Sequence, residues 1–370
     1  MAAPSIPNLL SMRGGAGGRG GGRDGRGIGC GRFPAAAGGA SADAVIQDTD
    51  TDAAVSRLSA VQVGYLDDPY AECFVSGPPT RRLPIINRGT YVRTRALDMI
   101  ISAFLSQPNG PGDGCSKQIV SLGAGTDTRP FRLLDSHSSQ ELVYHEIDFE
   151  PTCRRKYQII RTTPALASRF EDVEEAASGS WSARWRGGGG EYHCHAADLR
   201  SIHHDLAPVM GAAIRTNVPT LILSECCLCY LTHHESERVL DLFQSKMARL
   251  AIALYEPMPL DDTFGQVMLS NLKARKIHMP SLIRYKDASG QGERLRDAGF
   301  ETIGHASVKD AWDAWIDDQE KARLAALEGL DEVEEWQLLA AHYVVAWGAK
   351  QTGFGDFGRI AMTKQVGTGS

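Results

Sequence analysis

The sequence predicts an α/β protein built on one doubly wound, mostly parallel β-sheet. From about Ser56 onward, short apolar runs alternate with amphipathic stretches, without an internal repeat. The first apolar run, "QIVSLGAG", ends in glycines and follows the amphipathic stretch "TYVRTRALDMIISAFLSQ". Alternation of this kind over this length places helices on both faces of a parallel sheet.

Each element has its own local signal. The stretch before the first strand is expected to be a helix, because Val92, Ala96 and Ile100 recur at helical spacing. Residues 260–287 are expected to form a helical insertion before the last strand pair, and the stretch "SGSWSARWRGGGG" (178–190) a surface loop. Seven runs are expected to be strands: "QIVSLGAG", "LVYHEIDFEP", "EYHCHAADL", "TLILSECCLCYL", "LAIALYEP", "ETIGHA" and "AHYVVAWGAK".

The chain is predicted to consist of one folded domain, residues 50–350, between two flexible ends. The first forty residues hold thirteen of the 39 glycines and five arginines, so they bury too little apolar surface to offset their backbone entropy. Residues 1–49 are therefore expected to be a disordered leader, and residues 351–370 a flexible tail. An arginine-rich leader can also be a transit peptide, but its few apolar residues form no sustained amphipathic face.

The composition is that of an ordinary globular enzyme. Of the 370 residues, 42% are hydrophobic and 23% are charged, and the net charge is −6. This charge gives no reason to expect a nucleic-acid partner, and no apolar run approaches the ~20 residues of a membrane span. Eight cysteines without a secretory signal indicate reduced thiols, so a cytoplasmic location is expected.

The segment "SECCLCYLTHHE" concentrates three cysteines and two histidines, but a metal site is not expected there. C-C-x-C offers no paired C-x-x-C unit, and neighbouring strand residues point to opposite faces. The spacing of Thr232 and Glu235 predicts a capping box, so the histidines belong to the first turn of a helix. The cysteines are therefore interpreted as buried packing residues, and Glu225 is the residue with functional potential.

Residues that could take part in binding or catalysis lie at the ends of the first four predicted strands. Gly123 and Gly125 follow the first strand, and carboxylates follow the next three: Asp148, Asp198 and Glu225. Ligands of open α/β sheets bind outside the carboxyl ends of the strands. The sequence therefore predicts one crevice lined by glycines and three acids.

Two features favour a methyltransferase over a dinucleotide-dependent dehydrogenase. Asp148 lies about 23 residues beyond Gly125 and suits a ribose, which both classes bind. Thr128, however, stands where a pyrophosphate-binding loop has its third glycine. The acids at the third and fourth strands suit a cationic ligand with amino groups and would repel phosphates. The prediction is a Rossmann-like class I methyltransferase sheet.

Seven motifs resemble those of the leucine carboxyl methyltransferases: "GYLDDPYAECF", "INRGTYVRTRALD", "LGAGTDTRPFRL", "EIDF", "ADLR", "SECCLCYL" and "YEPMPLDDTFGQVM". The resemblance covers about residues 56–350, in the order of the family. It implies that S-adenosyl-L-methionine is the methyl donor. It also implies that the acceptor is the terminal carboxylate of the protein phosphatase 2A catalytic subunit, and that the enzyme is a monomer.

The resemblance also implies individual roles. Arg93 would bind the methionine carboxylate of the cofactor and Glu225 would lie near its amine. Gly123 and Gly125 would let the backbone approach it, and Asp148 would bind the ribose. The remaining cofactor-binding residues would be Asp198 and Leu199 at the adenine, and Arg57 where relatives often have lysine. Arg93 and Tyr230 are expected to contribute to catalysis, Tyr230 by lining the acceptor pocket.

Four alternatives are considered. Relatives that modify a wybutosine-type base in tRNA carry an additional repeat domain, and the charge of −6 argues against a tRNA substrate. The others are a methyltransferase acting on a small-molecule carboxyl or hydroxyl group, an NAD-dependent dehydrogenase, and an inactive phosphatase-binding fold. The basic run Arg154, Arg155 and Lys156 is expected to be a solvated helix face rather than a binding site.

Overall fold

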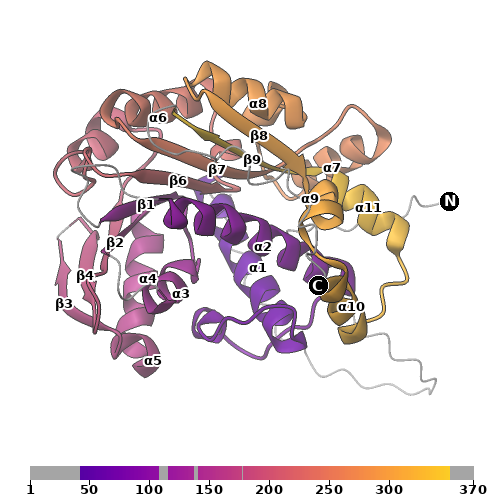
Figure 1. Cartoon of the computed structure of the whole chain (residues 1–370), viewed down its shortest axis with the longest axis horizontal. Helices are drawn as coiled ribbons and strands as arrows, with labels where there is room; N and C mark the ends of the chain where they lie inside the picture. The colour runs from indigo at the N-terminus through magenta and orange to yellow at the C-terminus, as the bar shows by residue number, and fades with distance from the viewer. Residues whose placement is uncertain (1–41, 108–115, 137–140, 177, 351–370) are drawn as a thin grey trace, which may run out of the picture.

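The computed structural model describes residues 42–107, 116–136, 141–176 and 178–350 (Figure 1). The predicted tail and residues 1–41 of the predicted leader lie outside the described residues. The end of the leader prediction was wrong, because residues 42–49 belong to helix α1 (Ala42–Val63). None of the described helices is long and apolar enough to cross a membrane.

The centre of the fold is a single sheet of described strands in the order β3-β4-β5-β2-β1-β6-β7-β9-β8. Strands β5, β2, β1, β6 and β7 are parallel, and β9 is antiparallel to both β7 and β8. All seven predicted strands are present. The strand bounds are β1 (Lys117–Leu122), β2 (Leu142–Asp148), β3 (Phe170–Glu175), β4 (Trp181–Trp185), β5 (Glu191–Ala196), β6 (Thr220–Glu225), β7 (Leu250–Pro257), β8 (Thr302–Ser307) and β9 (Tyr343–Ala349).

Two further strands extend the sheet beyond the seven predicted ones. The loop prediction for residues 178–190 was wrong, because β4 pairs antiparallel with β5 and β3 pairs with β4. In β4, Trp181, Ala183 and Trp185 are buried and alternate with more exposed residues. This is the period-two pattern of a half-buried strand. The glycines that follow β4 obscured the pattern in the sequence.

Helices cover both faces of the sheet (Figure 1). On one face, α1 packs against α2, and α2 packs against α9 and the strands β7 and β9. On the other face, α8 packs against β8 and β9. The remaining bounds are α2 (Pro84–Ser106), α3 (Arg129–Ser136), α4 (Glu150–Thr162), α5 (Pro164–Ala167), α6 (His233–Lys246), α7 (Thr263–Ala274), α8 (Ala288–Asp297), α9 (Val308–Trp315), α10 (Asp318–Leu327) and α11 (Val333–Ala341).

Successive residues of the central strands lie alternately in two separate hydrophobic cores. In β7, Ala251, Ala253 and Tyr255 join the core beneath α1 and α2, while Ile252 and Leu254 join the core beneath α6 and α8. This alternation follows from the two-residue period of a strand buried on both sides. The predicted helix before β1 and the predicted helical insertion are both confirmed, the latter as α7 and the short helix Pro280–Ile283.

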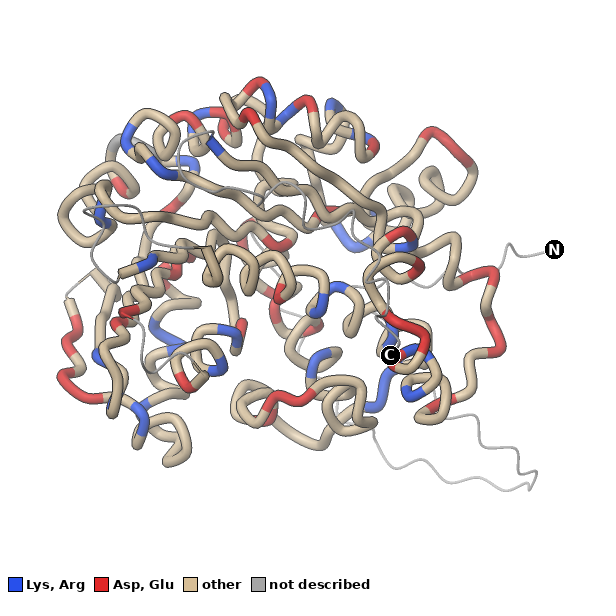
Figure 2. Tube along the Cα trace, in the orientation of Figure 1, with Lys and Arg blue, Asp and Glu red and all other residues tan. Residues whose placement is uncertain are grey.

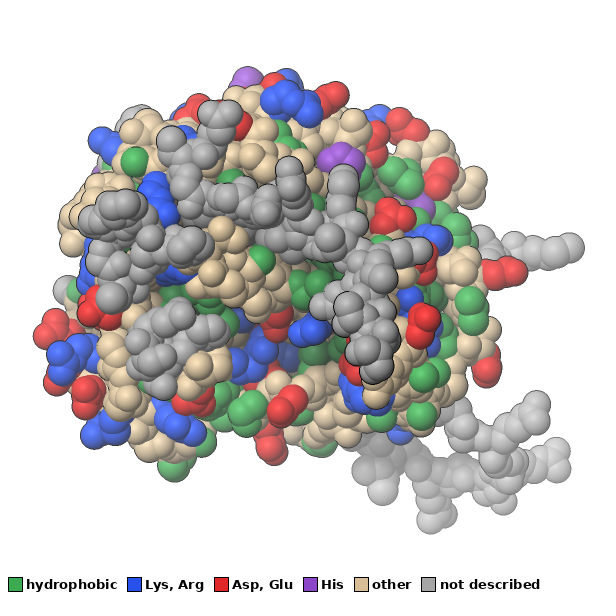
Figure 3. All heavy atoms as spheres, in the orientation of Figure 1, with side chains coloured by type: hydrophobic (Ala, Val, Ile, Leu, Met, Phe, Trp, Pro, Cys, Tyr) green, Lys and Arg blue, Asp and Glu red, His purple; other side chains and the backbone are tan. Residues whose placement is uncertain are grey.

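Acidic and basic residues are interspersed along the fold in Figure 2. On the face that Figure 3 shows, side chains of both signs are intermixed with hydrophobic ones. The predicted basic run on α4 divides between the surface and the core: Arg154 and Arg155 are exposed, but Lys156 is buried. The solvated-face prediction was therefore wrong for Lys156.

Lys156 links α4 to the turn after β1. Its Nζ donates to Glu146 Oε1 at 2.7 Å, Glu146 Oε2 at 2.6 Å and the carbonyl oxygen of Asp127 at 2.9 Å. Burial raises the pKa of Glu146 to about 7, although Lys156 opposes the shift. Because α4 turns this one position of its basic run inward, the lysine supports the glycine turn from beneath.

Three histidines on β2 and β5 stack on one another, and we expect them to make the fold sensitive to acid. The rings of His145 and His193 lie 4.7 Å apart and those of His145 and His195 5.3 Å apart. Burial lowers the pKa of all three histidines, that of His195 to about 4. Arg215 also lowers the pKa of His145 and His193. Glu191 acts in the opposite direction on His193.

The imidazoles are therefore neutral in the fold but protonate near pH 6.5 in the unfolded chain. Their contribution to stability is complete above that pH and declines as the pH falls below about 6.5. For His195, whose pKa in the fold is about 4, the decline is about 1.4 kcal/mol per pH unit down to about that pH. Urea unfolding across this range measures the slope. His195→Gln should flatten it, whereas exposed His234→Gln should not. Equal slopes for all three proteins would contradict the prediction.

Candidate active site at the carboxyl ends of the strands

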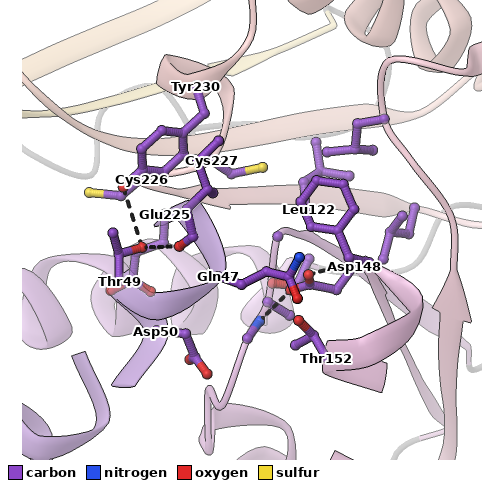
Figure 4. A pocket seen from close by; sticks show the side chains of 18 of the residues that line it. Gln47, Thr49, Asp50, Leu122, Asp148, Thr152, Glu225, Cys226, Cys227 and Tyr230 are labelled. Atoms are coloured by element: carbon purple, nitrogen blue, oxygen red, sulfur yellow. Dashed lines mark hydrogen bonds between the residues drawn. The ribbon is translucent and has the colours of Figure 1, made fainter. Parts of the chain in front are cut away.

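One cavity lies at the carboxyl ends of the central strands, where the strand order reverses between β1 and β6 (Figure 4). This main cavity is open to solvent, and the space between its walls, including solvent at its mouth, is about 1130 Å³. The structure brings every predicted site residue to its wall: Arg57, Arg93, Gly123, Gly125, Asp148, Asp198, Leu199, Glu225 and Tyr230. Besides Arg57, five residues of α1 also line it: Ile46, Gln47, Thr49, Asp50 and Ala53.

The glycine turn after β1 requires glycine at both predicted positions. Gly123 and Gly125 have φ values of 59° and 52°, in the left-handed region that disfavours side chains. A Cβ atom on Gly123 would lie 2.6 Å from the Sγ atom of Cys227. Because these two glycines have no side chains, the backbone of the turn leaves a space that any larger residue would fill; this turn is called the glycine cradle below.

Asp148 ends β2 beside this turn. Its Oδ2 accepts from the backbone N–H of Gly125 at 2.7 Å, and its Oδ1 accepts from that of Phe149 at 2.7 Å. Burial raises the pKa of Asp148, although these two donors act in the opposite direction. The carboxylate is thus fixed in place by two backbone groups and retains free lone pairs for the hydroxyl groups of a ligand.

Asp198 follows β5 and is held by a neighbour that the sequence did not suggest. Arg200 Nε donates to both of its oxygens, at 2.9 and 3.0 Å. The same guanidinium reaches Asp43 on α1 at 2.8 and 2.9 Å. Burial would raise the pKa of Asp198, but the bonds from Arg200 outweigh it and lower the pKa. Leu199 is buried beside it, and supplies an apolar wall at this end of the cavity.

Arg93 on α2 and Glu225 at the end of β6 form an ion pair through Nε and Oε1. The guanidinium of Arg93 also lies over the Tyr255 ring, 4.8 Å from its centroid. Burial would raise the pKa of Glu225, but Arg93 and Arg129 outweigh it and lower the pKa. The cavity therefore contains a permanent pair of opposite charges at its α2 side.

Arg57 and Tyr230 both form hydrogen bonds with other residues of the protein. Arg57 Nη1 donates to the carbonyl oxygen of Thr126 at 2.9 Å, so this arginine braces the glycine turn. The hydroxyl of Tyr230 donates to Thr49 at 3.5 Å (Figure 4). Burial raises the pKa of Tyr230 well above its ordinary value, so its hydroxyl is protonated at neutral pH and cannot act as a base.

Asp50 on α1 explains why the turn does not suit a dinucleotide. Its Oδ1 accepts from both the backbone N–H and the hydroxyl of Thr126, at 2.7 Å each. In dinucleotide-binding folds, donors at this position take the pyrophosphate. Here a carboxylate of the protein occupies them and would repel phosphate. Asp50 was not predicted from the sequence, because the first part of the same helix was assigned to the leader and the apolar pattern of the helix is weak.

Two of the three cysteines in the segment are buried as predicted, but Cys226 is only partly buried and lines the main cavity. Cys227 and Cys229 are buried, and Thr232 and Glu235 form the predicted capping box of α6. Cys226 has a φ of 52°, at the turn where β6 ends. Among the described residues, no three histidine, cysteine, aspartate or glutamate side chains are grouped so that they could hold a metal ion.

A glycine cradle followed by carboxylates at three further strand ends, on a mostly parallel sheet in which β4 and β9 run antiparallel to their neighbours, defines a Rossmann-like class I methyltransferase. The chain belongs to the leucine carboxyl methyltransferase family, whose family model matches residues 45–244. This match begins in α1, so the family region includes the helix that lines the main cavity.

Named relatives extend the similarity. Leucine carboxyl methyltransferase 1 of Emericella nidulans is 42% identical, over 96% of this chain and 98% of the relative. The protein of the same name from Schizosaccharomyces pombe is 38% identical, over 83% and 94%. The human tRNA wybutosine-synthesizing protein 4 is 32% identical over 81% of this chain, but only 43% of that protein is covered. The chain therefore matches nearly the whole of the first two relatives and less than half of the third.

Proposed function

We propose that the protein transfers a methyl group from S-adenosyl-L-methionine to the α-carboxylate of the C-terminal leucine of the protein phosphatase 2A catalytic subunit. The observation that carries the proposal is the main cavity, in which the glycine cradle, Asp148 and the Arg93–Glu225 pair meet in a chain of this family. The names of the relatives support the leucine carboxylate as acceptor.

The residues present fit this methyl donor. Asp148 would hold the ribose hydroxyls, and Asp198 with Leu199 would hold the adenine. Arg93 and Glu225 offer opposite charges to an amino-acid group that carries both a carboxylate and an ammonium. When bound, the donor supplies a methyl group activated by the positive charge of its sulfonium.

The residues around the cavity favour direct transfer. An α-carboxylate has an ordinary pKa of about 3.5, so the acceptor is already an anion at neutral pH and needs no base. Burial raises the pKa of Tyr230 well above its ordinary value and that of Cys226 to about 12, so neither side chain supplies a base or a nucleophile. The protein's contribution is to bind, orient and desolvate the two reactants.

The proposed location of the enzyme is the cytoplasm. The six described cysteines are free thiols, which supports a reducing compartment such as the cytoplasm. The proposal that the enzyme works as a monomer rests on the family resemblance.

Methyl labelling tests the acceptor. The protein is incubated with methyl-labelled S-adenosyl-L-methionine and phosphatase 2A catalytic subunit, either intact or lacking its terminal leucine. We expect label only on the intact subunit, released as methanol in mild base, because a methyl ester hydrolyses there and an amine adduct does not. If the protein binds the donor and labels neither form, the acceptor assignment is wrong. Label on a small carboxylic acid alone would support the small-molecule alternative.

A further inference from the structure

Arg129, the first residue of α3, is the buried cation behind the Arg93–Glu225 pair. Its side chain is 3% exposed and contacts three carboxylates. Nη1 donates to Asp127 at 2.6 Å and to Glu225 Oε2 at 3.0 Å, and Nε donates to Asp98 at 2.8 Å. Glu225 is therefore held on one oxygen by Arg93 and on the other by Arg129.

The two contacts of Glu225 have different consequences for a ligand. An amino-acid group that gives its carboxylate to Arg93 and its ammonium to Glu225 shares the charges that these two side chains now give each other. The contact between them uses only Nε of Arg93 and Oε1 of Glu225, so Arg93 can also bind the ligand through its other nitrogens. Without a second cation, Glu225 would then share its one cation with the ligand carboxylate in a buried place, which is costly. Arg129 can remain bonded to Oε2 throughout.

We propose that Arg129 is a positioning residue for the amino-acid end of the methyl donor. It holds Glu225 charged and oriented while Arg93 also binds the ligand carboxylate. This inference rests on the proposed function, because it takes S-adenosyl-L-methionine as the ligand of the main cavity.

The surroundings of Arg129 support an action through Glu225. Among the described residues, Arg129 lines a smaller cavity of about 310 Å³ rather than the main one, and the two cavities share Arg57, Asp127 and Glu225. Arg129 thus reaches the ligand site only through the shared carboxylates.

The cluster around Arg129 contains several ion pairs. Asp98 receives a second cation from Arg132, whose Nη1 lies 3.1 Å from its Oδ2. Three arginines, Arg93, Arg129 and Arg132, thus face four carboxylates, Asp68, Asp98, Asp127 and Glu225. Of these arginines, Arg93 and Arg129 contact Glu225, so loss of Arg129 would leave Glu225 with Arg93 as its cation.

Two ligands separate this role from general support of the fold. S-adenosylhomocysteine carries the amino-acid group, whereas 5′-methylthioadenosine has the same nucleoside thioether without it. For Arg129→Gln, titration calorimetry is expected to show about 30-fold weaker binding of S-adenosylhomocysteine or more, as for truncation of a buried charge pair. Binding of 5′-methylthioadenosine is expected to stay within about threefold of the unsubstituted protein, since the residues around the nucleoside are unchanged.

Arg132→Gln is the matched control. Arg132 lies one turn further along α3 and pairs with Asp98 but makes no contact with Glu225 among those the structure describes. Both ligands should bind this variant within about threefold of the unsubstituted protein. If Arg129→Gln does not fold, Arg129→Lys provides the comparison: lysine keeps the charge, but its single nitrogen does not reproduce the separate bonds of Nε to Asp98 and of Nη1 to Asp127 and Glu225. We expect it to weaken S-adenosylhomocysteine about tenfold and 5′-methylthioadenosine little.

Two outcomes would overturn the inference: an equal loss for both ligands, which indicates only structural support of the turn, or unchanged binding of S-adenosylhomocysteine. A different result concerns the proposed function itself. If the unsubstituted protein binds neither ligand, the assignment of the methyl donor fails, whatever the variants do.

Discussion

Replacement of Asp148 by alanine is expected to lower the affinity for S-adenosyl-L-methionine by about 100-fold or more. A carboxylate that accepts two ligand hydroxyls contributes about 1.5–3 kcal/mol for each hydrogen bond, and each 1.4 kcal/mol is tenfold in affinity. Asp148 is already oriented by the N–H groups of Gly125 and Phe149, so its geometry costs little on binding. Titration calorimetry measures the dissociation constant directly.

Substitutions of Asp148 and Arg129 are expected to differ in which ligands they weaken. Since the ribose is present in both probes, Asp148→Ala should weaken S-adenosylhomocysteine and 5′-methylthioadenosine by similar factors. Asp241→Ala, an exposed aspartate on α6, is the control and should change neither. Circular dichroism checks that the fold is retained. Affinity that remains unchanged in Asp148→Ala would mean that the nucleoside lies elsewhere in the main cavity.

The largest loss of stability is expected for Arg294→Met. Arg294 on α8 and Glu256 at the end of β7 are both fully buried, and Arg294 Nη1 lies 2.9 Å from Glu256 Oε2. Removal of the arginine leaves a buried carboxylate without its cation, which costs about 3–5 kcal/mol. At about 2–4 °C per kcal/mol, the melting temperature should fall by about 10 °C. Differential scanning calorimetry on the purified variant tests this.

Two further variants make the stability prediction specific. Arg296→Met changes an exposed arginine on the same helix and should leave the melting temperature within about 2 °C. The double variant Arg294→Met/Glu256→Leu removes both charges, and we expect it to recover part of the loss. A single variant as stable as Arg296→Met would show that water reaches Glu256 and that the pair contributes little.

The residues of the candidate site that lie at the ends of strands were predictable from the sequence. In a parallel sheet the carboxyl ends of the strands meet at one edge, so their order along the chain is enough to bring Gly123, Asp148, Asp198 and Glu225 together. Arg93 was found by resemblance to a family motif, since nothing in its helical spacing distinguishes it from a surface arginine. Their roles toward a ligand stay predictions, which the binding experiments address.

Residues on the covering helix were not predictable in the same way. Asp50 and Thr49 reach the main cavity because α1 crosses it, and the packing of α1 against α2 decides that placement. The two strands β3 and β4 were missed for a related reason. Their hairpin is fixed by pairing with β5, a contact between segments whose glycine-rich connection indicated a loop.

By itself, the sequence determined the alternation of seven strands with helices, the glycine turn, the order of the acids and the family. These depend on local periods and on fixed spacings along the chain. Only the tertiary structure decided how charges are shared: that Lys156 is buried under the glycine turn, that Arg200 joins Asp198 to α1, and that Glu225 lies between two arginines. The reason is physical. The partner of a buried charge is chosen by which side chains packing brings within hydrogen-bond distance, and such partners lie far apart in the chain.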